Sequence, residues 1–156
     1  MLFAEIGDTG YNLILFLHIA TLFMAFAPMF VHPFLDLQTR DDESVRRSIY
    51  GAIAQRSMRI HGSMLIIGGL LGFGLAGMSG KDANDELIIS VTDSWVWPSI
   101  VLWIAMNGVL HAMVVPGEKA IAAGDDEVAK KAEIGSTLIT VMFLATLYFM
   151  VFKPGF

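Results

Sequence analysis

Four histidines, His18, His32, His61 and His111, are the residues of this sequence best suited to chemistry. All four lie within or at the ends of long apolar stretches, and none lies in a plainly aqueous segment. Ionisable side chains at membrane depth are costly, so each is a candidate functional residue. Imidazole binds haem iron, zinc, copper and non-haem iron, and histidines on facing helices can clamp haem b through its two axial positions.

Depth in the membrane separates His18 from the other three histidines. At a rise of about 1.5 Å per residue, His18 lies about 10 Å below one membrane surface and His111 about 24 Å below it. His61 and His32 lie near the ends of their apolar stretches, at the level of His111. The spacing favours His111 with His61 as haem ligands and keeps His32 as a further candidate. We expect His111 to face the bundle interior, together with Asn107 one turn earlier on the same face.

Small residues form a stripe beyond His61 on the second apolar stretch. Gly68 and Gly72 share a face with His61 in the small-xxx-small pattern that lets membrane helices approach closely. Two interpretations stay open. The stripe serves helix packing, or it offers a flat surface to a porphyrin or quinone ring beside His61. The two interpretations are compatible if a cofactor lies between the helices.

A bare metal site is an alternative use of His18, His61 and His111. Asp36 and Glu118 lie near the same membrane surface as His111 and would complete a set of imidazole and carboxylate ligands. No short spacing between two histidines supports such a set. The sequence has no nucleotide-binding loop, no nucleophile elbow and no zinc-protease motif, and no residue pattern assigns a catalytic group.

Transmembrane helices are the elements that must position these residues. The chain is 55% hydrophobic and 16% charged, with a mean hydropathy of +0.64. This composition excludes an ordinary soluble domain and a disordered chain. Four stretches are long and apolar enough to span a bilayer as helices: 11–35, 59–78, 95–115 and 134–152. We expect one all-α domain over residues 1–156, an integral membrane four-helix up-down-up-down bundle.

Basic residues concentrate on two alternate connections between the spans. Eight of the ten Lys and Arg residues lie there: Arg40, Arg46, Arg47, Arg56, Arg59, Lys119, Lys130 and Lys131. The positive-inside rule puts these connections in the cytoplasm and both termini outside it. Apolar residues at helical spacing predict an interfacial or bundle-extending helix over residues 42–58.

Net charge and cysteine content exclude several kinds of partner and cofactor. The net charge is −5 and no basic block is present, which excludes nucleic acid as a partner. The chain has no cysteine, which excludes disulfides, iron–sulfur clusters and thiolate metal sites.

Four segments resemble the HemJ-type protoporphyrinogen oxidases, whose plan the copper-resistance CopD type shares. They are "LHIATLFMAFAPMFVHPFL", "RRSIYGAIAQRSMRIHGSMLIIGGLLGFGL", "LHAMVVPGEKAIAAG" and "LYFMVFKPGF". The resemblance implies a small bacterial inner-membrane haem b protein, with His18 and His111 at the positions of family histidines. The stretch "KKAEIGSTLIT" differs from the family's Asn-Glu-Val-Pro-like segment, so we carry over architecture and haem binding without the oxidase activity. The resemblance prefers His18 as the partner of His111, where depth prefers His61.

Three functions are open on this basis. The first is a small haem b-binding membrane redox protein that passes electrons between a donor, such as a porphyrinogen, and quinone. As an enzyme it would be a membrane oxidoreductase. The second is a non-catalytic accessory subunit of a larger membrane complex, which would use its small-residue face for helix packing. The third is a histidine-based metal-ion carrier or sensor. The lipid bilayer surrounds the protein in all three.

Overall fold

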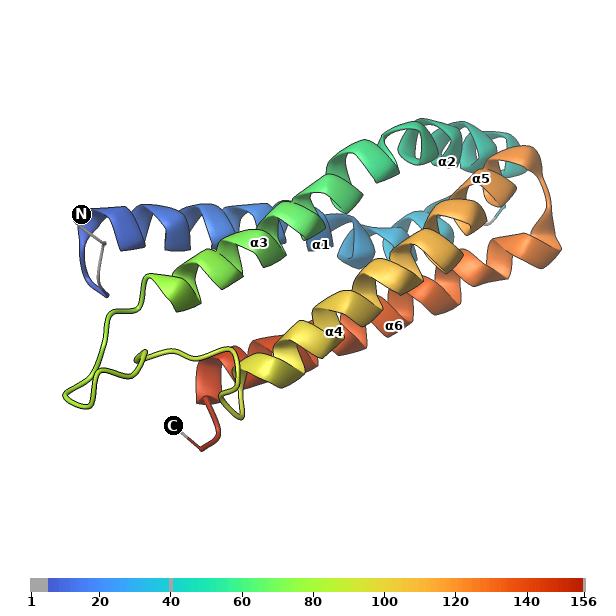
Figure 1. Cartoon of the computed structure of the whole chain (residues 1–156). Helices are drawn as coiled ribbons and strands as arrows, with labels where there is room; N and C mark the ends of the chain where they lie inside the picture. Colours follow the sequence, from blue (N-terminus) through green and yellow to red (C-terminus); the bar gives the residue numbers. More distant parts are fainter. Residues whose placement is uncertain (1–5, 40, 156) are drawn as a thin grey trace.

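Most residues lie in long helices in the computed structural model, which describes residues 6–39 and 41–155 (Figure 1). The elements are α1 (Thr9–Thr39), α2 (Glu43–Ser57), η1 (Met58–Gly62), α3 (Ser63–Gly77), α4 (Val96–Val109), η2 (Leu110–Val114), α5 (Val115–Ala123) and α6 (Asp126–Phe152). The turns η1 and η2 are π-helical and do not break the helices. The chain is therefore continuously helical from α2 through η1 into α3, and from α4 through η2 into α5. Arg40 lies outside the described residues.

Four helical runs in the described part of the chain are long and apolar enough to cross a membrane. They are Thr9–Thr39, Glu43–Gly77, Val96–Ala123 and Glu127–Phe152. The prediction of an all-helical chain is confirmed for the described residues, where only Lys81 and Leu87 pair in an isolated β-bridge. Each run is longer than the predicted span, because the helices continue beyond the apolar stretches. The predicted helix over residues 42–58 is present, and it extends the bundle.

Local capping explains where α2 and α6 begin. Asp42 precedes α2, and its carboxylate accepts hydrogen bonds from the Ser44 hydroxyl at 2.7 Å and the Val45 backbone N–H at 3.1 Å. These bonds stabilise the ionised form and lower the pKa of Asp42. Asp125 caps α6 in the same way, because its side chain accepts from the Val128 backbone N–H at 3.2 Å. Both α2 and α6 therefore begin with an aspartate as the N-terminal cap.

The helices pack in pairs, and two of the three buried apolar clusters among the described residues concern the site. In Figure 1, α1 lies beside α3, α4 beside α6, and α2 beside α5. The larger cluster fills the middle of the bundle with Ala25, Phe26, Met29, Leu65, Met106, Leu110, Val114, Val115 and Ile139. The smaller one joins α2, α5 and α6 through Tyr50, Ile121, Ala129 and Ala132. The candidate site lies between these two clusters.

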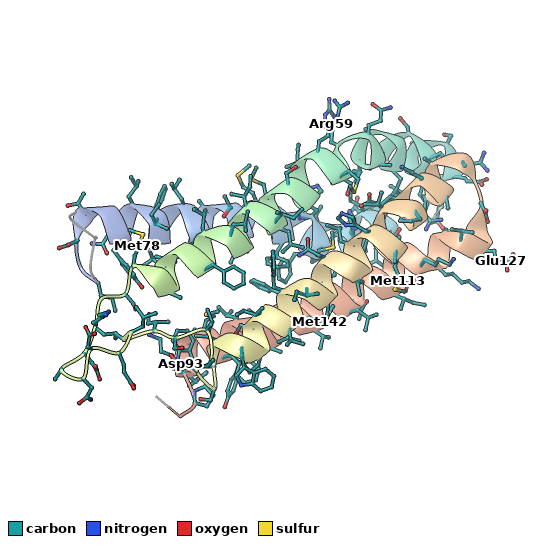
Figure 2. The ribbon with its side chains drawn as sticks, viewed as in Figure 1. Arg59, Met78, Asp93, Met113, Glu127 and Met142 are labelled. Atoms are coloured by element: carbon teal, nitrogen blue, oxygen red, sulfur yellow. The ribbon has the colours of Figure 1, made fainter. Side chains whose placement is uncertain are left out.

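The two ends of the bundle differ in charge and in connectivity. Both chain termini lie at one end together with the loop between α3 and α4, and α2 and α5 lie at the other (Figure 1). Met78 and Asp93 mark the first end in Figure 2, and Glu127 marks the second. Arg59 points outward from η1 (Figure 2). The basic residues of α2, α5 and α6 therefore gather at the end away from the termini.

Candidate functional site

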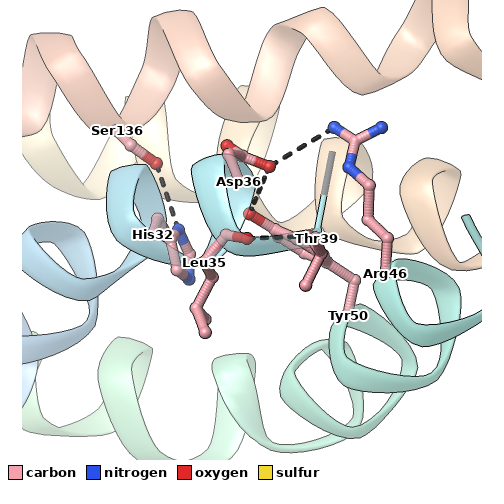
Figure 3. Close-up of polar contacts among 7 residues, drawn as sticks. All are labelled: His32, Leu35, Asp36, Thr39, Arg46, Tyr50 and Ser136. Atoms are coloured by element: carbon pink, nitrogen blue, oxygen red, sulfur yellow. Dashed lines mark hydrogen bonds and ion pairs between the residues drawn. The ribbon is translucent and has the colours of Figure 1, made fainter. Parts of the chain in front are cut away.

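A buried imidazole–carboxyl pair lies where α1, α5 and α6 meet. Nε2 of His32 on α1 is 3.4 Å from Oε1 of Glu118 on α5. The two side chains are 5% and 0% exposed. The other ring nitrogen of His32, Nδ1, is 3.3 Å from the hydroxyl oxygen of Ser136 on α6 (Figure 3). Each ring nitrogen of the imidazole therefore has a side-chain oxygen atom nearby.

Glu118 lacks the hydrogen bonds that usually accompany a buried charge. Among the described residues, neither of its carboxyl oxygens has a partner in hydrogen-bond geometry, and the same is true of Nε2 of His32. Ser57 on α2 lies beside this carboxyl group, and its hydroxyl is also buried. An ionised carboxylate without donors is costly to bury, whereas a carboxyl group that shares a proton with an imidazole is less so. The arrangement suits the exchange of a proton between Nε2 and Oε1.

A chain of polar contacts leads from His32 toward the basic end of the bundle. Asp36, one turn after His32 on α1, accepts hydrogen bonds from the Tyr50 hydroxyl at 2.8 Å and from Nη2 of Arg46 at 3.3 Å (Figure 3). The Tyr50 ring is buried, and its centroid lies 5.8 Å from that of His32. We call the following residues the polar cluster: His32, Asp36, Arg46, Tyr50, Ser57, Glu118 and Ser136.

His18 lies outside the polar cluster, in a contact between α1 and α3. Its Nδ1 atom is 2.7 Å from the carbonyl oxygen of Gly68. Its ring covers Gly72, where an added Cβ would lie 3.1 Å from Cε1 of His18. An added Cβ on Gly68 would lie 2.6 Å from the Leu22 side chain. The stripe thus packs against α1, as the packing interpretation predicts. Whether a ring also binds beside His61 stays a prediction.

The two histidines of the π-helical turns lie on turns that contact one another but differ in their surroundings. His61 in η1 is half-buried near the Met24 backbone of α1, and its Nδ1 atom is buried without a hydrogen bond among the described residues. His111 in η2 is exposed, and its Cε1 atom lies 3.7 Å from where a Cβ on Gly62 would be.

The expectation that His111 faces the bundle interior is wrong. Met106, Leu110 and Val114 are spaced four residues apart and take the interior face of this run. His111 follows Leu110 directly and is rotated about 100° away from that face. Asn107 is half-buried and donates to the Trp103 carbonyl oxygen of its own helix at 2.8 Å. Its Oδ1 atom is buried, which agrees only in part with the interior position expected for it.

Metal-ligand geometry finds no support in the part of the chain that the structure describes. No three histidine, aspartate or glutamate side chains come together there as a set that could hold a metal ion. Asp36 and Glu118, the expected carboxylate ligands, both belong to the polar cluster instead. Asp36 binds Arg46 and Tyr50, and Glu118 faces His32.

Similarity to known proteins gives no indication of function for this chain. No family model, no curated protein and no solved structure matches the chain. The resemblance to HemJ-type proteins therefore rests on the four quoted segments.

Sequence reasoning gave Glu118 a different role and did not single out Tyr50, Ser57 or Ser136. Glu118 follows the predicted end of the third span by three residues, which placed it at the membrane surface. The helical run continues to Ala123, so Glu118 lies inside a helix and against α1. Pro116 and Gly117 before Glu118, and Lys119 after it, are typical of the start of a loop. The sequence did contain one indication of the pair: His32 lies at the matching level of the first span.

Proposed function

We propose that the protein is a small membrane redox protein in which electron transfer is coupled to proton exchange at the His32–Glu118 pair. The observation that carries the proposal is a fully buried carboxyl group, 3.4 Å from an imidazole, inside a helix apolar enough to cross a membrane. Such ionisable groups mark proton relays in membrane proteins. Packed apolar residues would stabilise the same position at lower cost, so stability does not explain the pair.

Charge compensation gives the physical reason for the coupling. An electron placed on a group in a low-dielectric interior creates a charge whose energy scales inversely with the dielectric constant. A proton taken up nearby cancels that charge. A proton between the His32 and Glu118 side chains would have two acceptors 3.4 Å apart, so the pair could take up or release it with small movements. A membrane quinone is the proposed redox partner, because its reduction to the quinol consumes protons together with electrons.

The proposed setting is the inner membrane of a bacterium. We propose that the four runs cross it in an up-down-up-down bundle with both termini outside the cytoplasm. The positive-inside rule supports this orientation, because the basic residues gather around α2, α5 and the start of α6. The termini lie at the opposite end (Figure 1). The polar cluster would then lie near the cytoplasmic surface.

Infrared spectroscopy tests whether Glu118 exchanges a proton during redox change. In lipid nanodiscs, difference spectra between samples with a water-soluble quinone and with its quinol are expected to contain a carboxyl band. Glu118→Gln is expected to remove that band, because it replaces the acid with an amide of the same shape. Glu127→Gln, which changes an exposed carboxylate on α6, is the matched control and should keep it. A difference spectrum that Glu118→Gln leaves unchanged contradicts the proposal.

The exposed ring of His111 favours haem b as the electron carrier. His32 is a poor haem ligand, since its two ring nitrogens face Glu118 and Ser136. The ring of His18 packs against Gly72 in the contact between α1 and α3, and its bond to the Gly68 carbonyl leaves only Nε2 for a ligand. His111 fits a haem on the outer face, because its exposed ring lies beside Gly62 in an apolar run. A bare imidazole facing lipid is unfavourable, so something is expected to cover it. Haem b supplies a one-electron centre when bound.

The haem proposal predicts an absorption spectrum that depends on His111. Protein purified from cells with ample haem is expected to have a Soret band, which His111→Ala removes or shifts. His18→Ala and His61→Ala are expected to keep the band, because neither ring is free on the outer face. A colourless natural protein would contradict haem binding. Other subunits that co-purify with it would then favour the accessory-subunit alternative, with a partner helix covering His111.

A further inference from the structure

A charged pocket opens beside the polar cluster at the basic end of the bundle. It has a volume of about 230 Å³ and lies between α1, α2, α5 and α6. Its lining residues are Asp36, Arg46, Ile121, Ala129, Lys130 and Glu133. Two of these side chains are basic and two are acidic, so the pocket has no strong preference for either sign of charge. It is wide enough to admit water.

Asp36 belongs both to this pocket and to the polar cluster. Its carboxylate lines the pocket while it accepts hydrogen bonds from Arg46 and Tyr50. It lies four residues after His32, on the same face of α1, and the two side chains interact electrostatically. One carboxylate therefore separates the pocket from the imidazole that faces Glu118.

The opposite side of His32 is closed by apolar packing. Met29 lies one turn before His32 on α1 and is buried in the larger apolar cluster with Leu110 and Val114. Val114 is 0% exposed, and it lies one turn before Glu118 on the run from η2 to α5. Tightly packed apolar side chains carry no proton. This side of the pair is therefore apolar, and of the two carboxyl groups near His32 it is Asp36 that lines the pocket.

We propose that protons reach Glu118 from this pocket through Asp36 and His32. The inference rests on the proposed function, and it adds the entry route and the side of the membrane. In this route Asp36 takes a proton from water in the pocket and gives it to Nδ1 of His32, where it replaces the contact with the Ser136 hydroxyl. The ring then releases its Nε2 proton to the Glu118 carboxylate at Oε1. Asp36 returns to the ionised form and the ring stays neutral, so one proton is transferred and no electron moves. Arg46 and Tyr50 are positioning residues, because their hydrogen bonds hold the Asp36 carboxylate at the pocket wall.

Other titratable groups around the route limit which residues can be replaced in a test. Arg46 and Tyr50 face it from α2, His61 from η1, and Lys130 and Glu133 from α6. Removing Lys130 or Glu133 would change the charge of the pocket as well as its shape. Variants that test the route therefore change Asp36, and the control changes a carboxylate outside the pocket. A variant at Lys130 is compared only with the same variant before its thiol is blocked.

The proposal predicts slow hydrogen–deuterium exchange of the Glu118 carboxyl group when Asp36 is removed. The readout is the rate at which the infrared band that Glu118→Gln removes shifts after the buffer is changed to deuterium oxide. Asp36→Asn is expected to slow the shift about 100-fold, the usual contribution of one acid–base group. Asp36→Glu is expected to restore most of the rate, and Glu127→Gln to leave it unchanged. The restoring variant separates loss of the proton carrier from a folding defect.

Blocking the pocket gives an independent test of the side of entry. The chain has no cysteine, so Lys130→Cys and Asn84→Cys each introduce a single reactive thiol. A bulky thiol reagent on Cys at position 130 is expected to slow the exchange, while the same reagent at position 84, in the loop at the far end, is not. Exchange at the natural rate in both Asp36→Asn and the blocked protein would overturn the entry route. A natural protein without any Glu118 carboxyl band would instead contradict the proposed function itself.

Discussion

A His32→Leu/Glu118→Met double variant is expected to be at least as stable as the natural protein. Glu118→Met alone is expected to lower the free energy of unfolding by about 2 kcal/mol, because it leaves a buried ring nitrogen of His32 without a polar neighbour. The double variant removes both polar groups together and fills the site with apolar side chains of similar size. Replacing a buried polar pair in this way is often neutral or stabilising.

Unfolding in bicelles by added denaturing detergent measures this double-mutant cycle. Glu127→Met, at an exposed position of α6, is the control for the change of residue type and should have little effect on stability. The double variant should also lack the Glu118 infrared band despite its stability. A double variant that loses as much stability as the two single changes added together would show that the two side chains are not coupled, which contradicts their assignment as one proton-exchanging pair.

Gly117→Ala is expected to loosen the contact that places Glu118 against α1. A Cβ at Gly117 would lie 2.4 Å from the backbone nitrogen of Ala132 on α6 and 2.7 Å from its Cβ. Both helices would have to move apart, since backbone atoms cannot give way as a flexible side chain does. Overpacking of this kind costs about 1–3 kcal/mol. We also expect faster exchange of the Glu118 carboxyl group, because water would reach the separated helices.

Gly108→Ala is the matched control for this prediction. Gly108 also lies within a helix of the same run, but an added Cβ there meets nothing within 4 Å. Its replacement should raise stability by about 0.5–1 kcal/mol, the usual gain when alanine replaces a glycine inside a helix. Thermal unfolding followed by circular dichroism compares the two variants. Equal effects of Gly117→Ala and Gly108→Ala would mean that α5 and α6 are not in close contact at Gly117.

The histidines show how far spacing along the chain can locate a site. The sequence predicted that His61 and His111 lie at the same level of the bundle, and the structure does bring their turns into contact. Which way each ring points was not readable. His111 follows Leu110, and the choice of which of these neighbours faces inward depends on how the whole run is rotated against α6. That rotation is set by the packing of Met106, Leu110 and Val114, which one sequence does not encode locally.

The glycines show the same limit in a different form. The Gly68–Gly72 pattern predicted a close helix contact, and the contact exists. The sequence left open whether a helix or a cofactor ring would occupy it, because both need the same absence of side chains. The structure places His18 and Leu22 of α1 there. The Nδ1 atom of His18, the histidine that the family resemblance favoured as a ligand, lies 2.7 Å from the Gly68 carbonyl oxygen.

The amino-acid sequence by itself determined that this chain forms long apolar helices with their basic residues on alternate connections. These properties depend on composition and on periodicity within each segment, which physical rules of helix formation and bilayer thickness convert directly into structure. Only the tertiary structure decided that His32, Glu118, Ser136 and Tyr50 form one buried cluster. These residues come from four helices, and their meeting depends on helix rotation, on the continuation of the third run past Val115, and on the close approach at Gly117. Each is a property of packing between segments distant in the chain, so no single segment contains it.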